Sequence, residues 1–312
     1  MIIDSHVHIF PRVDGYGPKG KTKGGTYGRV DQGDGKPAWV LPVVCEETRH
    51  TREMLLANMD RYGVDKAVLL QGYCYGNWNS YVAEAVRLHP DRFIGAAVFD
   101  PWAPGAREHY EEDIAAKPWP VLKLEFSESS GLSGVYPSAR LYSEDLRWLY
   151  TDLEARGRVL VLDLGQPGTR GYQTDAVRAI ANAHPGLTIV ICHMGQLSPD
   201  IEADAVLYRA WEEQLALGKL ENVYFDASAV PFQVQATDEY PWPTAQRYVR
   251  KALEYLGAKK LMFGSDIPWL YCLATYGQLI EFGRKCTAGL STQDQDWFLY
   301  KTAQKVYWGE KA

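Results

Sequence analysis

The sequence has no long apolar run and no excess of positive charge. No stretch of about 18 apolar residues occurs, so we expect no transmembrane helix. A formal net charge of −6 argues against non-specific binding to nucleic acid or to anionic membranes. The chain begins on an apolar run without a basic segment before it, so we expect no cleaved signal peptide. These absences leave a small molecule as the expected partner.

Two motifs are missing as well. The five cysteines form no C-x-x-C pair, which predicts reduced thiols and a cytoplasmic location. No G-x-G-x-x-G follows the first apolar run. A doubly wound open sheet that binds a dinucleotide is therefore the weaker of the two α/β architectures that the chain could form.

The chain does contain a regular alternation of apolar runs and helical patterns. Continuous apolar strands that alternate with helices indicate parallel pairing, because helices cover both faces of such a sheet. Eight units in 312 residues predict a single (β/α)8 barrel domain over residues 1–312. The predicted strands are 1–8, 65–72, 92–100, 120–126, 158–165, 187–195, 222–228 and 260–266, and the predicted helices are 49–62, 78–89, 143–156, 173–184, 200–217, 243–256, 275–286 and 293–308.

Residues 11–48 interrupt this alternation. They are rich in Gly, Lys and Asp, and they show little periodicity. A loop of this length inside a compact domain is usually functional or disordered. It leaves the carboxyl end of the first strand, which is the active face of a barrel. We therefore predict a lid or a pocket wall, with a mobile surface loop as the alternative.

The first predicted strand reads MIIDSHVHIF. Residues two apart in a strand point to one face, so Asp4, His6 and His8 should share it. Two imidazoles side by side in a core are costly unless something binds them. Such a pair usually binds a divalent metal ion, and a hydrogen-bonded pair of core histidines is the alternative.

Polar residues end most of the other predicted strands. Catalytic residues of a (β/α)8 barrel lie at the carboxyl ends of its strands, so these side chains should converge on one mouth. A buried charge at such a position needs a partner. The set is Lys123 and Glu125 on the fourth strand, Asp163 on the fifth, His193 on the sixth, Asp226 on the seventh and Asp266 on the eighth.

Three motifs carry a family resemblance. They are D-S-H-x-H after the first strand, C-H-M-G after the sixth and F-G-S-D-x-P after the eighth. Together they resemble the amidohydrolase superfamily, and in particular the amidohydrolase-related branch that includes aminocarboxymuconate-semialdehyde decarboxylase and lactone hydrolases. The resemblance implies a distorted (β/α)8 barrel. It also implies one divalent metal ion, often zinc, bound by His6, His8 and Asp266.

The chain departs from this branch on the fifth strand. Members usually have a metal-binding histidine there, whereas this chain reads LVLDLGQPG with Asp163 at that position. Asp163 either binds the metal or hydrogen-bonds a histidine that does. A site of two histidines and two aspartates suits Mn²⁺ or Fe²⁺ as well as Zn²⁺. A site that binds metal weakly or not at all is the third interpretation.

The resemblance also suggests how the site would work. We expect Asp266 to accept a proton from an attacking water and to pass it to the leaving group. We expect His193 to orient that water or to donate to the developing oxyanion. Four further residues are expected to contact substrate: Lys123 and Arg170 through an anionic group, Glu125 beside Lys123, and Trp269 by stacking on a ring.

These residues support more than one reaction. Hydrolysis of a lactone or related carboxylated substrate is the first expectation, because the two histidines and Asp266 form a complete water-activating set. Non-oxidative decarboxylation of an aromatic or unsaturated acid is the second. A non-catalytic binding barrel with a decayed site is the third. The many Trp and Tyr residues make a homodimer an additional expectation.

Overall fold

The computed structural model describes residues 1–43 and 46–309. Eight parallel strands form one sheet in the order β1-β6-β7-β8-β9-β10-β11-β12. Val7 on the first strand forms a parallel bridge with Ile267, just beyond the last, so the sheet closes on itself. The predicted (β/α)8 barrel is confirmed. Its strands are β1 (Ile3–His8), β6 (Lys66–Leu70), β7 (Phe93–Val98), β8 (Val121–Glu125), β9 (Val159–Asp163), β10 (Thr188–Ile191), β11 (Val223–Asp226) and β12 (Leu261–Met262).

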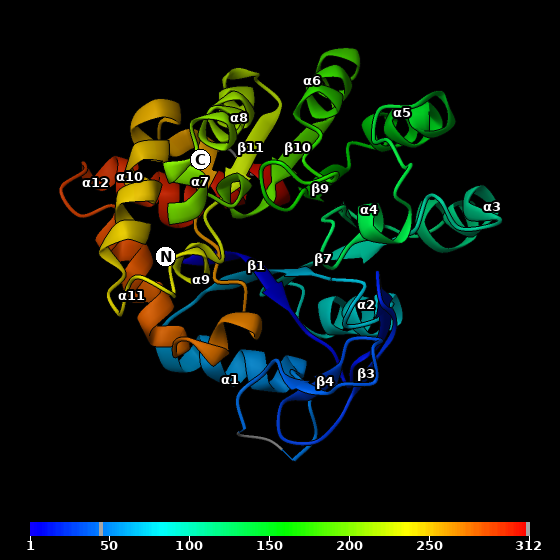
Figure 1. Cartoon of the computed structure of the whole chain (residues 1–312), viewed down its shortest axis with the longest axis horizontal. Coiled ribbons are helices and arrows are strands. Elements are labelled where there is room, and N and C mark those ends of the chain that lie inside the picture. Colours follow the sequence, from blue (N-terminus) through cyan, green and yellow to red (C-terminus); the bar gives the residue numbers. More distant parts are fainter. Residues whose placement is uncertain (44–45, 310–312) are drawn as a thin grey trace.

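Helices surround the strands on the outside (Figure 1). The helix predicted over 200–217 is two helices, because Asp204 interrupts it and its side chain caps the second one. The segment predicted as the last helix begins as α12 and continues as π-helical turns to Trp308. The helices are α1 (Arg52–Tyr62), α2 (Asn79–Leu88), α3 (Ala106–Tyr110), α4 (Leu132–Val135), α5 (Arg147–Ala155), α6 (Thr174–Ala183), α7 (Pro199–Ala203), α8 (Ala205–Leu215), α9 (Val230–Gln233), α10 (Pro243–Leu256), α11 (Tyr276–Cys286) and α12 (Thr292–Asp296).

The barrel has two layers of core. Side chains that point outward from the strands pack against the helices in one large apolar cluster. Those that point inward, such as Ile3, Val161 and Met262, form a second cluster together with Tyr307 from the C-terminal turns. The strands are therefore buried on both faces, which explains why they read as continuous apolar runs rather than as alternating ones.

The segment predicted as a long loop forms a small antiparallel sheet. Its order is β2-β3-β4-β5, with β2 at Asp14–Gly17, β3 at Gly20–Gly24, β4 at Arg29–Asp31 and β5 at Ala38–Trp39. Figure 1 shows β3 and β4 at one side of the barrel. Gly15 lies so close to the loop after β6 that an added Cβ would be 2.0 Å from the carbonyl oxygen of Tyr73. Residues 44 and 45 of the predicted 11–48 lid, and residues 310–312 of the predicted domain, lie outside the described residues.

None of the described helices has both the length and the apolar character needed to cross a bilayer.

Candidate active site

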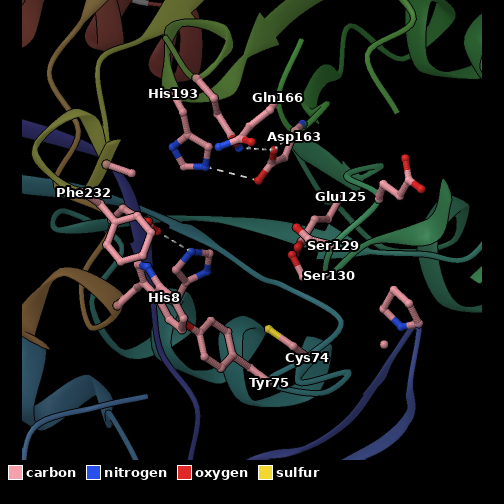
Figure 2. Close-up of a pocket in the computed structure, with 18 of the residues that line it drawn as sticks. His8, Cys74, Tyr75, Glu125, Ser129, Ser130, Asp163, Gln166, His193 and Phe232 are labelled. Atoms are coloured by element: carbon pink, nitrogen blue, oxygen red, sulfur yellow. Dashed lines mark hydrogen bonds and ion pairs between the residues drawn. The ribbon is translucent and has the colours of Figure 1, made fainter. Parts of the chain in front are cut away.

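A cavity of about 470 Å³ lies at the carboxyl ends of the barrel strands (Figure 2). Eight of the nine predicted site residues line it. The barrel therefore brings together side chains that are up to 263 positions apart in the chain, from Ile3–His8 to the loop after Leu261–Met262. The eight are His6, His8, Lys123, Glu125, Asp163, His193, Asp266 and Trp269.

Asp4 does not join them. The register of β1 against β6 shifts between Asp4 and Val7, which turns this side chain away from the face expected of a regular strand. Its carboxylate instead accepts hydrogen bonds from the backbone N–H and hydroxyl of Ser265 and from the hydroxyl of Tyr276. The expectation that Asp4 shares a face with both histidines is therefore wrong.

His6 presents a lone pair to the cavity. Its Nδ1 lies 3.1 Å from Oδ2 of Asp226, which can only accept, so Nδ1 carries the proton. Burial lowers the pKa of His6 and outweighs the opposing effect of Asp226. The ring is therefore neutral near pH 7, and its Nε2 is an acceptor. That Nε2 is buried and has no hydrogen-bond partner among the described residues.

His8 presents a second lone pair. Its Nδ1 donates to the backbone carbonyl of Leu70 at 3.1 Å, and burial lowers the pKa of the ring to about 4. The neutral ring therefore directs the lone pair of Nε2 toward Oδ1 of Asp266, 3.1 Å away. Two acceptors at that distance repel each other unless a cation lies between them. His50 also holds the end of this strand, because its Nδ1 donates a hydrogen bond to the backbone carbonyl of His8 at 2.7 Å.

These three side chains fit a divalent metal ion. Nε2 of His6 lies 3.6 Å from Oδ1 of Asp266, and Nε2 of His8 lies 3.1 Å from the same oxygen. Ligands about 2.1 Å from a tetrahedral zinc lie about 3.4 Å from one another, so both distances match a small cation held between these atoms. Asp266 holds its position with a backbone φ of 61°, a left-handed conformation that is strained for a non-glycine residue.

A second group of potential ligands, His6, His193 and Asp226, is already satisfied by hydrogen bonds. Oδ1 of Asp226 accepts from the backbone N–H of His193 at 2.9 Å and from the backbone N–H and hydroxyl of Ser228, and Oδ2 accepts from His6. Burial raises the pKa of Asp226, but the two histidines and Ser228 outweigh it and hold the pKa below its usual range. Asp226 is therefore an orienting carboxylate rather than a ligand.

His193 is held as a cation. It lies in a tight turn after β10 with a φ of 59°. Its Nδ1 is 2.7 Å from the hydroxyl of Ser228 and its Nε2 is 3.2 Å from Oδ2 of Asp163. Burial lowers the pKa of His193, but the surrounding carboxylates, Asp163 first, raise it to about 9. The protonated ring is thus a fixed positive charge at the cavity wall, which could stabilise a developing oxyanion through its charge.

Asp163 contacts His193 (Figure 2), and no hydrogen bond or ion pair joins it to either histidine of β1 among the described residues. It belongs to neither group of three potential metal ligands found in the described part of the chain. Its other oxygen accepts from the backbone N–H of Gly165 and the side chain of Gln196. Of the two interpretations of this residue, the geometry favours the hydrogen-bonding one, with His193 as its partner, over direct metal binding.

Lys123 and Glu125 are buried side by side on β8. The ammonium of Lys123 makes no hydrogen bond and no ion pair within 4 Å among the described residues. Burial lowers the pKa of Lys123, but Glu125, Asp163 and Asp266 raise it above the usual value, so it remains charged. Glu125 pairs in register with Asp163, and burial raises its pKa to about 7. Lys123 is therefore a cation available to an anionic substrate group.

The remaining two predicted substrate contacts differ. Trp269 lines the cavity and packs edge-on against Phe232, with ring planes inclined at 61° and 5.5 Å between centroids. Arg170 does not line it. Its guanidinium forms an ion pair with Glu128, and Glu128 lines the rim. The ion pair neutralises both groups, so Arg170 is not free for a substrate.

Several lining residues have no counterpart in the sequence prediction. The insertion contributes Thr22 of β3 and Gln32 just after β4, and helix α9 contributes Phe232 and Gln233. Ser228, which bonds His193, was missed as well. The D-A-S spacing places it on the same side of the chain as Asp226, and this alternation could have identified it. No sequence signal identifies Thr22 or Gln32, because only the fold brings the insertion to the barrel mouth.

Solved structures with the same fold cover nearly the whole chain at low identity. A probable 2-pyrone-4,6-dicarboxylic acid hydrolase from Acinetobacter baumannii, with citric acid bound, is 18% identical with a TM-score of 0.70, and 98% of each chain is covered. An amidohydrolase from Burkholderia multivorans with bound zinc is 17% identical with a TM-score of 0.70, and 98% of this chain and 99% of that chain are covered. A 2,6-dihydroxybenzoate decarboxylase in complex with 2,6-dihydroxybenzoate is 15% identical with a TM-score of 0.56, over 85% of this chain and 90% of that one.

A search of curated proteins finds no match. The sequence model of the amidohydrolase family, in contrast, matches residues 3–308. The match includes the two histidines of β1, the turn after β10 and the aspartate after β12, which are the elements that build the cavity. The chain therefore belongs to the amidohydrolase family.

Proposed function

We propose that this protein is a metal-dependent hydrolase that opens a small cyclic ester carrying a carboxylate. The observation that carries the proposal is the convergence of three potential metal-ligand atoms, Nε2 of His6, Nε2 of His8 and Oδ1 of Asp266, at the bottom of the cavity. Two imidazole nitrogens and a carboxylate oxygen at these distances are typical of a divalent metal site. When bound, a divalent ion would supply Lewis acidity and lower the pKa of water toward about 7, so that a nucleophilic hydroxide can form near neutral pH.

Asp266 and His193 then have different roles in the reaction. The pKa of Asp266 is held below its usual range because His8, His6 and His193 outweigh the effect of its burial, so it is a carboxylate at neutral pH. It accepts the proton of the attacking water and returns it to the alkoxide that leaves when the ester bond breaks. The protonated His193, whose two N–H groups are taken by Ser228 and Asp163, stabilises by its positive charge the oxygen on which negative charge develops.

The charge pattern of the cavity supports a carboxylated substrate. Lys123 is a buried cation without a close partner among the residues that the structure describes, and an anionic group would satisfy it. The aromatic rings of Trp269 and Phe232 provide an apolar wall for a ring. Citric acid, bound in the structure from Acinetobacter baumannii, is also a carboxylate, which agrees with this choice.

Decarboxylation is the second candidate, and one observation favours it. Glu125 is a buried carboxyl group with a pKa of about 7, so near neutral pH it exists partly in its protonated form. A protonated acid next to Lys123 could deliver a proton to the carbon that loses carbon dioxide. The fold similarity to a dihydroxybenzoate decarboxylase agrees with this alternative.

Metal content and turnover together test the proposal. The full chain, purified without added metal or chelator, is analysed by elemental mass spectrometry and assayed against lactones and aromatic acids. We expect about one zinc, manganese or iron ion per chain and hydrolysis of a carboxylated lactone. No metal and no uptake on titration would contradict a metal-dependent reaction. Metal-dependent release of carbon dioxide without hydrolysis would favour the second candidate, and neither activity would favour a binding protein.

The variant Asp266→Asn separates the role of this carboxylate from the fold. We expect turnover to be lost while the thermal unfolding temperature stays near that of the wild type. Asp4→Asn, which changes a buried carboxylate outside the cavity, is the matched control and should retain turnover. Unchanged turnover in Asp266→Asn would remove Asp266 as the proton carrier.

A further inference from the structure

Ser228 lies two residues beyond Asp226, at the end of β11, and is fully buried. Its hydroxyl oxygen contacts two of the three histidines that line the cavity, His6 and His193. It is 2.7 Å from Nδ1 of His193 and 3.2 Å from Nδ1 of His6, and it donates to Oδ1 of Asp226. One hydroxyl therefore joins three of the groups that make up the site.

The direction of each proton follows from chemistry. Oδ1 of Asp226 accepts three donors, among them the backbone N–H groups of His193 and Ser228, so it has no proton to give. The single proton of the Ser228 hydroxyl is therefore committed to Asp226. Only the oxygen lone pairs remain for the imidazoles, so His193 must donate from Nδ1. The ring is then oriented with Nε2 toward the cavity wall formed by Asp163.

The two histidines depend on Ser228 to different degrees. Nδ1 of His6 also has the carboxylate of Asp226 as an acceptor, at 3.1 Å. For Nδ1 of His193, the hydroxyl of Ser228 is the hydrogen-bond partner found in the described part of the chain. His193 also sits in a strained turn, since Met194 beside it has a φ of 50°. The Ser228 hydroxyl should therefore be needed for the orientation of His193 and dispensable for that of His6.

We propose that Ser228 is a positioning residue that fixes the ring of His193 by accepting its Nδ1 proton while anchored to Asp226. This inference rests on the proposed function for its effect on turnover, because His193 is there the positive charge that stabilises the developing oxyanion. Its structural content does not depend on a substrate. Removal of the hydroxyl should disturb His193 and leave the metal ligands in place.

The test compares Ser228→Ala with Ser265→Ala in the full chain. Ser265 is an equally buried serine that also donates its hydroxyl and its backbone N–H to a buried aspartate, but it touches no histidine ring of the cavity. Three quantities are measured for each variant: the zinc dissociation constant, kcat and KM for the lactone found in the screen, and the ¹⁵N NMR signal of the His193 side chain at fixed pH, assigned with His193→Asn.

We expect Ser228→Ala to lower kcat about 10- to 100-fold, the usual effect of losing a group that orients a functional side chain. KM and the zinc dissociation constant should change less than about threefold, and the hydrogen-bonded Nδ1–H signal of His193 should disappear through exchange with water. Ser265→Ala should change none of these quantities by more than about threefold, whatever it does to the unfolding temperature.

An unchanged His193 signal in Ser228→Ala would overturn the inference. So would a loss of zinc affinity equal to the loss in kcat, or the same kinetic loss in Ser265→Ala, because either result would mean a general structural role. If the wild type hydrolyses no lactone, the proposed function fails, and the NMR signal and zinc affinity still decide the role of Ser228.

Discussion

Two serine–aspartate pairs stand at neighbouring strand ends of this barrel, and only one of them belongs to the site. Asp226 with Ser228 follows β11, and Asp4 on β1 pairs with Ser265 after β12. Both carboxylates are fully buried. Each accepts the backbone N–H and the hydroxyl of its serine. The local chemistry of the two pairs is therefore nearly the same.

Their other partners differ. Asp226 accepts from the ring of His6, and Ser228 accepts from the ring of His193. Asp4 accepts from the neutral hydroxyl of Tyr276 instead. Burial raises the pKa of both carboxyls, but the histidines reverse the effect at Asp226, whereas the pKa of Asp4 rises to about 6. A buried carboxylate thus becomes part of a functional site through the charge of its neighbours, not through its own hydrogen-bonding motif.

Among the substitutions that distinguish the two serine–aspartate pairs, Asp226→Asn should have the largest effect, and the quantity it changes is metal affinity. The amide weakens the acceptor that holds Nδ1 of His6, and it removes the charge that faces His193. Loss of a partner that orients a metal ligand usually weakens metal binding about 10- to 100-fold. We expect a change of that size in the zinc dissociation constant, measured by competition with a chelating dye.

Asp4→Asn is the control for that measurement. Because Asp4 contacts His6 only through the backbone N–H, zinc affinity should change less than about threefold. If both substitutions weaken zinc binding equally, the distinction between the two pairs is wrong.

The stability of the protein should depend on pH through Asp4. The unfolded chain releases this proton near the ordinary value of 3.8, whereas the folded chain holds it until about pH 6. Folded protein therefore binds more protons between these values, and stability falls as the pH rises from about 4 to about 6. A shift of about two pKa units corresponds to about 3 kcal/mol. The wild type should lose unfolding free energy of that order between pH 4 and pH 7, and Asp4→Asn should not. Urea unfolding at both pH values measures the difference.

The control for this experiment is Asp226→Asn, and the quantity compared is the slope of the unfolding free energy against pH. Asp226→Asn should not flatten the fall between pH 4 and 6, because the pKa of Asp226 lies below that window. If wild type and Asp4→Asn lose equal stability across it, Asp4 is ionised in the folded protein at pH 4.

Tyr276→Phe should have a smaller effect. It removes one hydrogen bond to the carboxylate of Asp4, which is buried with the tyrosine ring between α11 and the barrel. Hydrogen bonds to charged groups contribute about 1.5 to 3 kcal/mol, so the free energy of unfolding should drop by about that amount at pH 7. Tyr255→Phe, on an exposed ring, should leave it unchanged. Equal zinc affinity in Tyr276→Phe and Tyr255→Phe would show that the hydrogen bond between Tyr276 and Asp4 is structural.

Asp163→Ala should have the smallest effect on metal binding. The carboxylate contacts His193 and lies outside both groups of potential ligands in the described residues. We therefore expect zinc affinity to change less than about threefold, while kcat falls because His193 loses an acceptor. Release of the metal in this variant would restore Asp163 as a ligand and would argue against the three-residue set.

The order of strands and the histidine pair were predictable because both are local patterns. A strand buried on both faces reads as an apolar run, and a helix between two such runs indicates parallel pairing. His6 and His8 lie two residues apart, so their shared face follows from strand geometry. The insertion was harder, because β2 to β5 carry many glycines and lysines with little alternation, although they pair as a sheet that lies against the loop after β6.

The sequence by itself therefore determined the barrel, the mouth at which the polar strand ends meet, and the histidines and aspartates at it. Only the tertiary structure decided which role each takes. Asp163 pairs with His193, Arg170 is neutralised by Glu128, and a shift in the register of β1 removes Asp4 from the site. The physical reason is that protonation and hydrogen-bond direction depend on contacts between β1, β9, β10 and β11, which are distant in the chain and meet only when the barrel closes.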